Sequence, residues 1–110
     1  MCGIIGYWSK SVSGQSDRMS EKLQNALTAL HHRGPNERGS WSDERHGVGL
    51  GHTRLSIIGL SNGRQPLVSE DKKLRAVVNG EFYGFETIRE QLRSQGHHFS
   101  TESDSEILIH

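Results

Sequence analysis

The apolar residues of this chain follow two periods, and each period predicts a type of secondary structure. Residues 3–8 form a short apolar run that includes two glycines, which predicts a buried strand. A polar loop follows over residues 9–16. Apolar residues then recur at helical spacing, which predicts a helix from Asp17 to about His31 with Ser16 as its N-cap. The chain therefore opens with a strand, a loop and a helix.

The middle of the chain favours strands over helices. Residues 37–46 are polar and predict a short strand or a loop, whereas residues 48–58 alternate small, apolar and polar side chains and predict a strand. Two further apolar runs, residues 67–68 and 74–78, flank a charged turn. We expect these two runs to pair as a hairpin across residues 70–73.

The last third of the chain predicts a helix, a short strand and the start of another helix. Residues 85–95 have helical spacing, with Ile88 and Leu92 on the inward face and Gly96 as the stop. Residues 98–101 predict a short strand.

The sequence Ser103-Asp104-Ser105-Glu106 then matches a capping box, with Ser103 as the N-cap and Glu106 at the third helical position. This helix opens with the apolar run 107–109, whose side chains need a surface to pack against. Hydrophobic residues make up only 32% of the chain, which is low for an independent globular domain. We therefore expect residues 1–110 to be part of a larger, truncated domain.

The charge balance and the cysteine content exclude several classes of protein. The 13 basic and 13 acidic residues cancel, so neither a nucleic acid nor an anionic membrane is indicated as a partner. A single cysteine cannot form an internal disulfide and fits a reducing compartment such as the cytoplasm. The sequence has no signal-peptide pattern and no apolar run long enough to span a bilayer. The seven histidines lack metal-ligand spacing, and we expect no metal site.

The single cysteine, Cys2, is the first candidate for chemistry. A small side chain at position 2 permits removal of Met1, which would place a thiol and a free α-amine on one residue. The amine, with a reference pKa of about 7.7–8.0, suits a general base, and the deprotonated thiol is a strong nucleophile. The alternative is that Cys2 is a small hydrophobic residue buried at the start of a strand.

Six blocks, in the same order and spanning nearly the whole chain, resemble the class II glutamine amidotransferases, which are N-terminal-nucleophile hydrolases. The blocks are Met1-Cys2-Gly3-Ile4, His32-Arg33-Gly34-Pro35, Gly51-His52-Thr53-Arg54-Leu55-Ser56-Ile57, Gln65-Pro66-Leu67, Asn79-Gly80-Glu81-Phe82-Tyr83 and Ser103-Asp104-Ser105-Glu106. The second and third blocks look most like the asparagine synthetase branch. The family often has Asp after His-Arg-Gly-Pro, where this chain has Asn36.

The resemblance implies an α+β fold, namely the N-terminal portion of an αββα sandwich with antiparallel sheets. It also implies hydrolysis of glutamine through a thioester on Cys2, with ammonia as the first product. The side-chain amide of Asn79 and the backbone N–H of Gly80 would form the oxyanion hole. The alternative for the Asn-Gly pair is an ordinary turn.

The resemblance also assigns the binding of glutamine. Arg54 would bind the α-carboxylate, because a guanidinium offers a planar pair of donors to a carboxylate. Asp104 would pair with the α-ammonium, Glu81 is a second acidic contact, and Ile57 would face the substrate through its backbone. The opposite charges of Arg54 and Asp104 would select a zwitterion. The alternatives are a solvated charge at a strand end for Arg54 and a helix-dipole contact for Asp104.

In the full-length relatives, the resemblance implies that ammonia is channelled to a synthetase domain of the same chain, which uses ATP and Mg²⁺ to make asparagine. It also allows a homodimer. Three alternatives remain: a paralogue that amidates a different substrate, a non-catalytic regulatory relative, and a thiol sensor built on Cys2.

Overall fold

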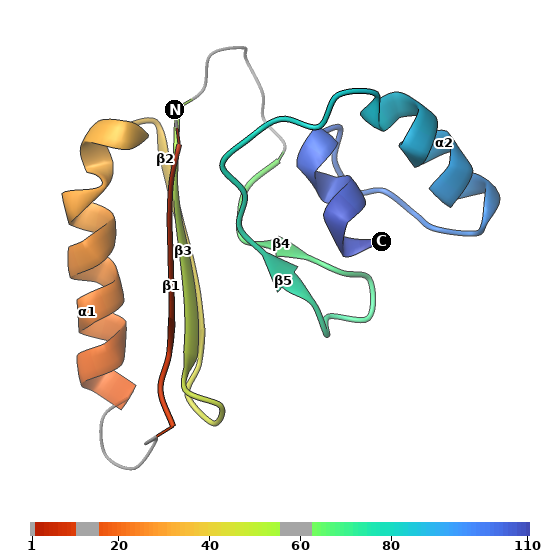
Figure 1. Ribbon diagram of the computed structural model, residues 1–110. Helices are drawn as coiled ribbons and strands as arrows, with labels where there is room; N and C mark the ends of the chain where they lie inside the picture. Colours follow the sequence, from red (N-terminus) through yellow and green to blue (C-terminus); the bar gives the residue numbers. More distant parts are fainter. Residues whose placement is uncertain (1, 11–15, 56–62) are drawn as a thin grey trace.

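The computed structural model describes residues 2–10, 16–55 and 63–110 of the 110-residue chain (Figure 1). Helices and antiparallel strands are mixed along it, which confirms the α+β prediction. The elements are β1 (Gly3–Trp8), α1 (Ser16–Ala29), η1 (His31–Arg33), β2 (Glu37–Asp43), β3 (Val48–Arg54), β4 (Leu67–Val68), β5 (Arg75–Ala76), α2 (Phe85–Ser94) and η2 (Asp104–Ile109).

The larger sheet has three strands in the order β1-β3-β2, and both pairings are antiparallel. The central strand, β3, ends at Arg54, and residues 56–58 of the predicted strand lie outside the described part of the chain. The polar segment predicted as a strand or a loop is the edge strand β2. Since β3 is hydrogen-bonded on both sides, the residues at its end are held by two neighbouring strands.

The predicted hairpin across residues 70–73 is confirmed, with Leu67 opposite Ala76. Its second strand is shorter than predicted, because only Arg75 and Ala76 pair with β4. Arg75 lies over the ring of Trp41, with its guanidinium carbon 4.6 Å from the ring centroid. This cation–π contact connects the hairpin to the larger sheet.

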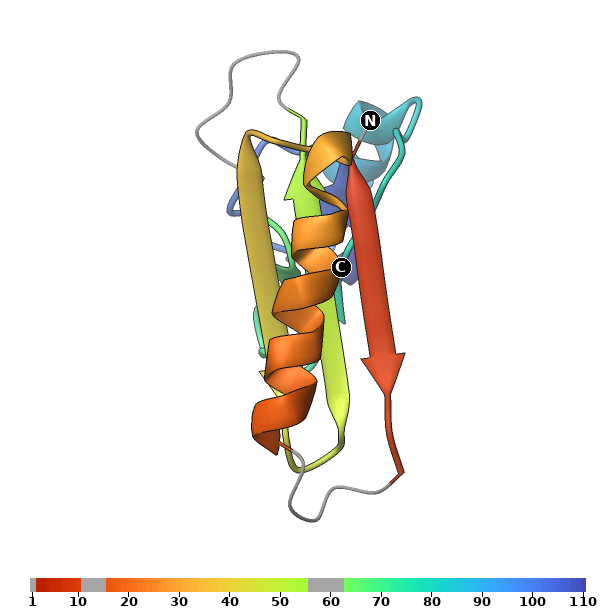
Figure 2. The same ribbon diagram turned by 90° about the vertical axis from the view of Figure 1, so that its left-hand side faces the viewer.

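Helix α1 lies along one face of the larger sheet, as Figure 2 shows from the side of the helix. The helix begins at Ser16, so the residue predicted as the N-cap is its first residue. Leu23 and Leu27 of the helix are buried, and a Cβ on Gly51 of β3 would lie only 2.8 Å from Cδ2 of Leu27. The absence of a side chain at Gly51 therefore lets the helix pack closely on the central strand.

The elements form successive layers in Figure 1: α1, the three-stranded sheet, the β4–β5 hairpin, and then η2 with α2. Contacts of η2 with β4, β5 and α2 hold the last two layers together. The order helix, sheet, sheet, helix matches the predicted αββα arrangement.

The inward face of α2 differs from the prediction. The helix ends before Gly96 as expected, but Ile88 is 41% exposed and Leu92 only half-buried. Arg89 is buried instead: its Nη2 donates to the carbonyl of Ser103 at 2.8 Å, and its guanidinium lies 5.3 Å from the centroid of Phe99. Hydrophobic periodicity fails here because a long arginine stem can bury its apolar carbons while its head finds a carbonyl and a ring.

The predicted strand over residues 98–101 is wrong, and one carboxylate explains why. Glu106, 1% exposed, accepts hydrogen bonds from the backbone N–H groups of Ser100 at 2.6 Å and Thr101 at 2.7 Å. The segment therefore wraps around a side chain instead of pairing with a strand. The N-cap prediction for Ser103 is confirmed, since its Oγ accepts from the Ser105 N–H at 3.3 Å.

The other half of the predicted capping box is wrong, because Glu106 bonds to residues 100 and 101 rather than back to Ser103. The element that follows is a 3₁₀ helix. Within the described residues, no helix is both long and apolar enough to cross a membrane.

Candidate functional site

The N-terminal segment is anchored to the central strand at one end of the larger sheet. Cys2, a half-buried residue with a free thiol, directly precedes β1. The backbone N–H of Gly3 donates to Oγ1 of the buried Thr53 at 3.1 Å, and that hydroxyl donates to the carbonyl of Leu30 at 3.3 Å. Because Gly3 is opposite Thr53, Cys2 and Arg54 are the next residues along the two strands, at the same end of the sheet.

Arg54 is held by an acidic residue that the sequence analysis did not single out. Its Nη1 donates to Oε2 of Glu37 at 3.1 Å, and the Arg54 side chain is only 14% exposed. Glu37 is directly opposite Arg54 in the pairing of β2 with β3. The only signal in the sequence was its place just after the His-Arg-Gly-Pro block, since the register that brings the two side chains together is a property of the sheet.

The His-Arg-Gly-Pro block packs against the backbone of this strand end. A Cβ on Gly34 would overlap the backbone of Thr53 and Arg54, so only glycine permits this approach. The next residue but one, Asn36, donates its N–H to the Arg54 carbonyl at 3.0 Å. Arg33 lies beside the N-terminal strand, with its Cβ 3.4 Å from the position of a Cβ on Gly3. The block therefore packs against both the end of β3 and the start of β1.

A cavity of about 550 Å³ opens beside Arg54, within the range of small-molecule sites. Three residues predicted to bind glutamine line it: Arg54, Glu81 and Asp104. The other lining residues are Phe82, Tyr83, Gly84, Phe85, Glu86, Glu102 and Ser103. Among the described residues that line the cavity, Arg54 is the only cation and several are acidic, so the cavity can distinguish the two charged ends of a zwitterion.

Arg54 and the start of η2 approach each other across Gly63. A Cβ built on Gly63 would lie 3.8 Å from Nη2 of Arg54 and 3.3 Å from the Cβ of Ser103. Asp104 follows Ser103, and its Oδ2 accepts from the backbone N–H of Phe82 at 2.7 Å. The predicted ammonium ligand therefore also holds the segment that follows Asn79 and Gly80.

The two predicted oxyanion-hole residues lie next to the cavity in sequence but do not line it. Asn79 and Gly80 are exposed and directly precede Glu81, which does line the cavity. No described atom comes within 4 Å of the position of a Cβ on Gly80. Close packing against the described residues therefore does not require glycine there, and none of them fills the space beside it.

Two further predicted site residues are Ile57 and Cys2. Ile57 lies outside the described residues, and Cys2 is not among the residues that line the cavity. Within the described ranges, no group of three or more His, Cys, Asp or Glu side chains is arranged to hold a metal ion. The structure thus brings three of the predicted residues into one cavity and places Cys2 at the same end of the sheet.

Comparison with known proteins gives consistent matches over the whole chain. A family model described as glutamine amidotransferase domain matches residues 1–110. The chain is 39% identical over 109 residues to an "Asparagine synthetase [glutamine-hydrolyzing] 1" of Bacillus subtilis, and the match covers 99% of this chain and 17% of that protein. It is 42% identical over 117 residues to an "Amidase chry2" of Gibberella zeae, with the same coverage of 99% and 17%.

A "Probable asparagine synthetase [glutamine-hydrolyzing]" of Dictyostelium discoideum is 38% identical, and the match covers 100% of this chain and 19% of that protein. The chain thus spans less than a fifth of the length of these curated relatives. The layered α+β architecture with antiparallel sheets is consistent with the N-terminal part of an N-terminal-nucleophile hydrolase. On the match over residues 1–110, this chain belongs to the glutamine amidotransferase domain family.

Proposed function

We propose that this chain supplies the glutamine-hydrolysing site of a larger amidotransferase, with Cys2 as the nucleophile. One observation carries the proposal: Arg54, Glu81 and Asp104 line one cavity, at the end of the sheet where the N-terminal segment bearing Cys2 is anchored. A site for glutamine needs a cation and an anion for the two ends of the amino acid, and a nucleophile for the amide.

Recognition of glutamine would depend on opposite charges. Arg54 would bind the α-carboxylate and Asp104 the α-ammonium, with Glu81 as a second acidic contact and the backbone of Ile57 facing the substrate. The Glu37 carboxylate supports this role because it limits the orientations of the Arg54 guanidinium before substrate binds. The cavity volume of about 550 Å³ accommodates an amino acid.

The chemistry begins with removal of Met1, which frees the α-amine of Cys2. The amine takes the thiol proton through a water molecule, and Sγ attacks the carboxamide carbon of glutamine. The oxyanion that forms accepts hydrogen bonds from the Asn79 side chain and the Gly80 N–H. The C–N bond then breaks and ammonia leaves with a proton. Water adds to the thioester, the C–S bond breaks, and glutamate leaves with the thiol restored.

The ammonia would pass to a synthetase domain elsewhere in the full-length protein, where ATP and Mg²⁺ would activate aspartate for conversion to asparagine. The support for this step is the similarity to the asparagine synthetases of B. subtilis and D. discoideum. We also propose a cytoplasmic location, which suits a free N-terminal thiol, and a homodimer for the full-length protein.

A second candidate differs only in the molecule that receives the ammonia. The chain is 42% identical to the amidase chry2 of G. zeae, which is at least as similar as the asparagine synthetases. An amidotransferase that acts on another carboxylate would carry the same glutamine site. Asparagine formation from aspartate, ATP and glutamine by the full-length protein supports the first candidate, and glutamine hydrolysis without asparagine supports the second.

The test of the glutamine site is ammonia release from glutamine by the full-length protein, compared with its Cys2→Ala variant. We expect the variant to retain less than about 1% of the activity, because the thioester cannot form. Equal release from both proteins would refute the nucleophile assignment. Intact mass measurement of the active protein tests whether the α-amine of Cys2 is free to act as the base. If Met1 is still attached to the active chain, the α-amine mechanism is refuted.

A further inference from the structure

Two side chains together bind both backbone polar groups of Val78, the residue before Asn79. The Val78 N–H donates to Oε1 of Gln65 at 2.6 Å, and the Val78 carbonyl accepts from Nε2 of His52 at 3.1 Å. The pairing of β4 with β5 ends at Ala76, so the ladder of this hairpin does not bind Val78. We call His52 and Gln65 the Val78 clamp.

The histidine of the clamp is buried and donates from a known ring nitrogen. His52 is only 2% exposed on the central strand β3, and a carbonyl can only accept, so Nε2 of His52 carries the hydrogen. Burial lowers the pKa of His52, which favours this neutral donor form near pH 7.

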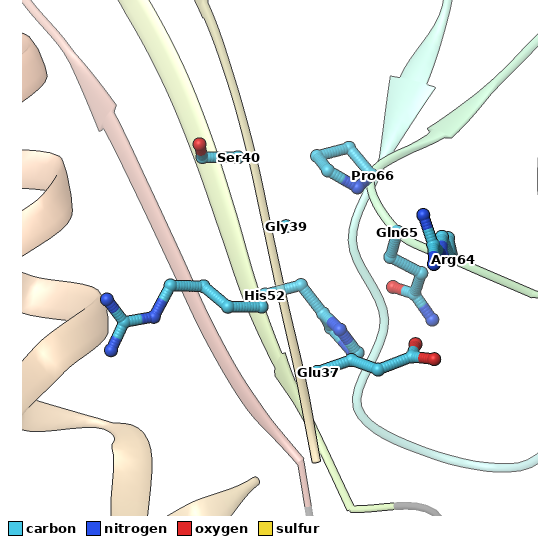
Figure 3. Close-up of a pocket in the computed structure, with 8 residues that line it drawn as sticks. Glu37, Gly39, Ser40, His52, Arg64, Gln65 and Pro66 are labelled. Carbon is cyan, nitrogen blue, oxygen red and sulfur yellow. The ribbon is translucent and has the colours of Figure 1, made fainter. Parts of the chain in front are cut away.

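Gln65 reaches the clamp because the edge strand leaves room for it. Gly39 of β2 is opposite His52, and a Cβ on Gly39 would overlap the carbonyl of Gln65. His52, Gly39 and Gln65 line one cavity of about 560 Å³ (Figure 3). The approach of the Gln65 backbone to the sheet therefore depends on a glycine in the strand next to His52.

The clamp connects two parts of the proposed glutamine site. His52 and Arg54 are two residues apart on β3 and so point to the same face of the sheet. Arg54 would bind the substrate carboxylate, whereas His52 holds the segment that leads into Asn79 and Gly80. The distance between the carboxylate anchor and the oxyanion donors is thus set partly by one strand and one hydrogen bond.

We infer that His52 and Gln65 are positioning residues, which set the place of the Asn79–Gly80 oxyanion donors relative to Arg54. The inference rests on the proposed function. It also gives a role to parts of two sequence blocks, Gly51-His52 and Gln65-Pro66, to which the glutamine site assigns no chemistry. Displacement of catalytic donors by about 1 Å can cost about 100-fold in rate.

The test uses pairs of variants of the full-length protein. His52→Leu and Gln65→Leu remove the donor and the acceptor, whereas His52→Gln and Gln65→Glu keep a donor and an acceptor in similar places. We expect each Leu variant to lower kcat for glutamine hydrolysis about 10- to 100-fold with KM within about 3-fold, because oxyanion donors act mainly in the transition state. The conservative variants should recover most of kcat.

Two further measurements separate positioning from a general loss of stability. The double Leu variant should lose little more kcat than the worse single variant, because both act on Val78. Hydrogen exchange at the Val78 amide should accelerate in Gln65→Leu but not in Gln65→Glu, and this readout does not need glutaminase activity. A wild-type protein without glutaminase activity would refute the proposed function. Accelerated exchange at the Val78 amide in Gln65→Leu would still show that the clamp exists.

Three results would overturn the inference itself. One is an unchanged kcat in both Leu variants. Another is a rise in KM equal to the fall in kcat, which would place the defect in substrate binding. The third is loss of folded structure in both Leu variants by circular dichroism, which would assign the pair a purely structural role.

Discussion

Glu37 and Arg54 are paired directly across two antiparallel strands, and the distance from Oε2 to Nη1 is 3.1 Å. The pair lies at the end of the sheet, beside the cavity that Arg54 lines. An arginine that must receive a carboxylate gains from such a partner, since its guanidinium is oriented before the substrate arrives. The pair leads to the first prediction.

Glu37→Ala should weaken glutamine binding without much effect on the chemical step. Removing a partly exposed, charge-assisted hydrogen bond costs about 1 kcal/mol of binding free energy after solvent screening. The KM for glutamine should therefore rise about 5-fold, while kcat changes little. Steady-state glutaminase kinetics measure both constants. The control is Glu44→Ala in the exposed turn between β2 and β3, which should leave KM unchanged. Equal KM values for Glu37→Ala and wild type would contradict the prediction.

Two glycine substitutions should separate folding from catalysis. Gly34→Ala forces a Cβ into the backbone of Thr53 and Arg54, and we expect a loss of about 1–3 kcal/mol in the free energy of unfolding. Gly80→Ala adds a Cβ where no described atom lies within 4 Å, so stability should stay within about 0.5 kcal/mol. If Gly80 faces the substrate, kcat should nevertheless fall. Urea unfolding measures the stability of both variants, and glutaminase assays measure their kcat. A larger loss of stability in Gly80→Ala than in Gly34→Ala would contradict the prediction.

Glu106→Gln should destabilise the C-terminal segment. The carboxylate accepts the backbone N–H groups of Ser100 and Thr101, and an amide would turn a donor toward one of them. An unsatisfied buried N–H costs about 1–3 kcal/mol. The matched substitution Glu90→Gln, on the exposed side of α2, should change stability by less than about 0.5 kcal/mol. Urea unfolding of the two variants tests the difference, and equal stabilities would contradict it.

The titration of His52 should lower the stability of the folded chain as the pH falls through the histidine range. Burial lowers the pKa of His52 in the folded state below its ordinary value near 6.5. Well above pH 6.5 the histidine is neutral in both states and has no effect on stability. Below it, the unfolded chain binds a proton that the folded chain does not, so stability decreases until the pH reaches the lower folded pKa.

Urea unfolding at pH 7.5 and pH 5.5 measures this dependence. The loss between the two pH values should be smaller in His52→Gln, which has no titrating group at this position, while the other six histidines act in both proteins. An identical pH dependence in wild type and variant would show that His52 titrates normally.

Local sequence patterns predicted the elements well where a single face or run decides the structure. Strand β1 and hairpin β4–β5 were predicted from short apolar runs, and Gly96 ends α2 as expected. The pattern failed where polar side chains replace apolar ones inside the structure. Arg89 takes the buried place expected for Ile88, and the Glu106 carboxylate organises the segment predicted as a strand.

The candidate site divides in the same way. The sequence by itself determined which side chains are candidates for the chemistry, because a thiol at position 2, the cation Arg54 and the acid Asp104 are recognisable as residue types in their motifs. Only the tertiary structure decided what holds them. Glu37 is opposite Arg54 through strand register, and His52 meets Val78 across 26 positions of sequence. The register depends on the turn between the two strands and on which face of each strand is buried. The contact of His52 with Val78 depends on how distant segments pack, so the type of residue at these positions reveals neither partner.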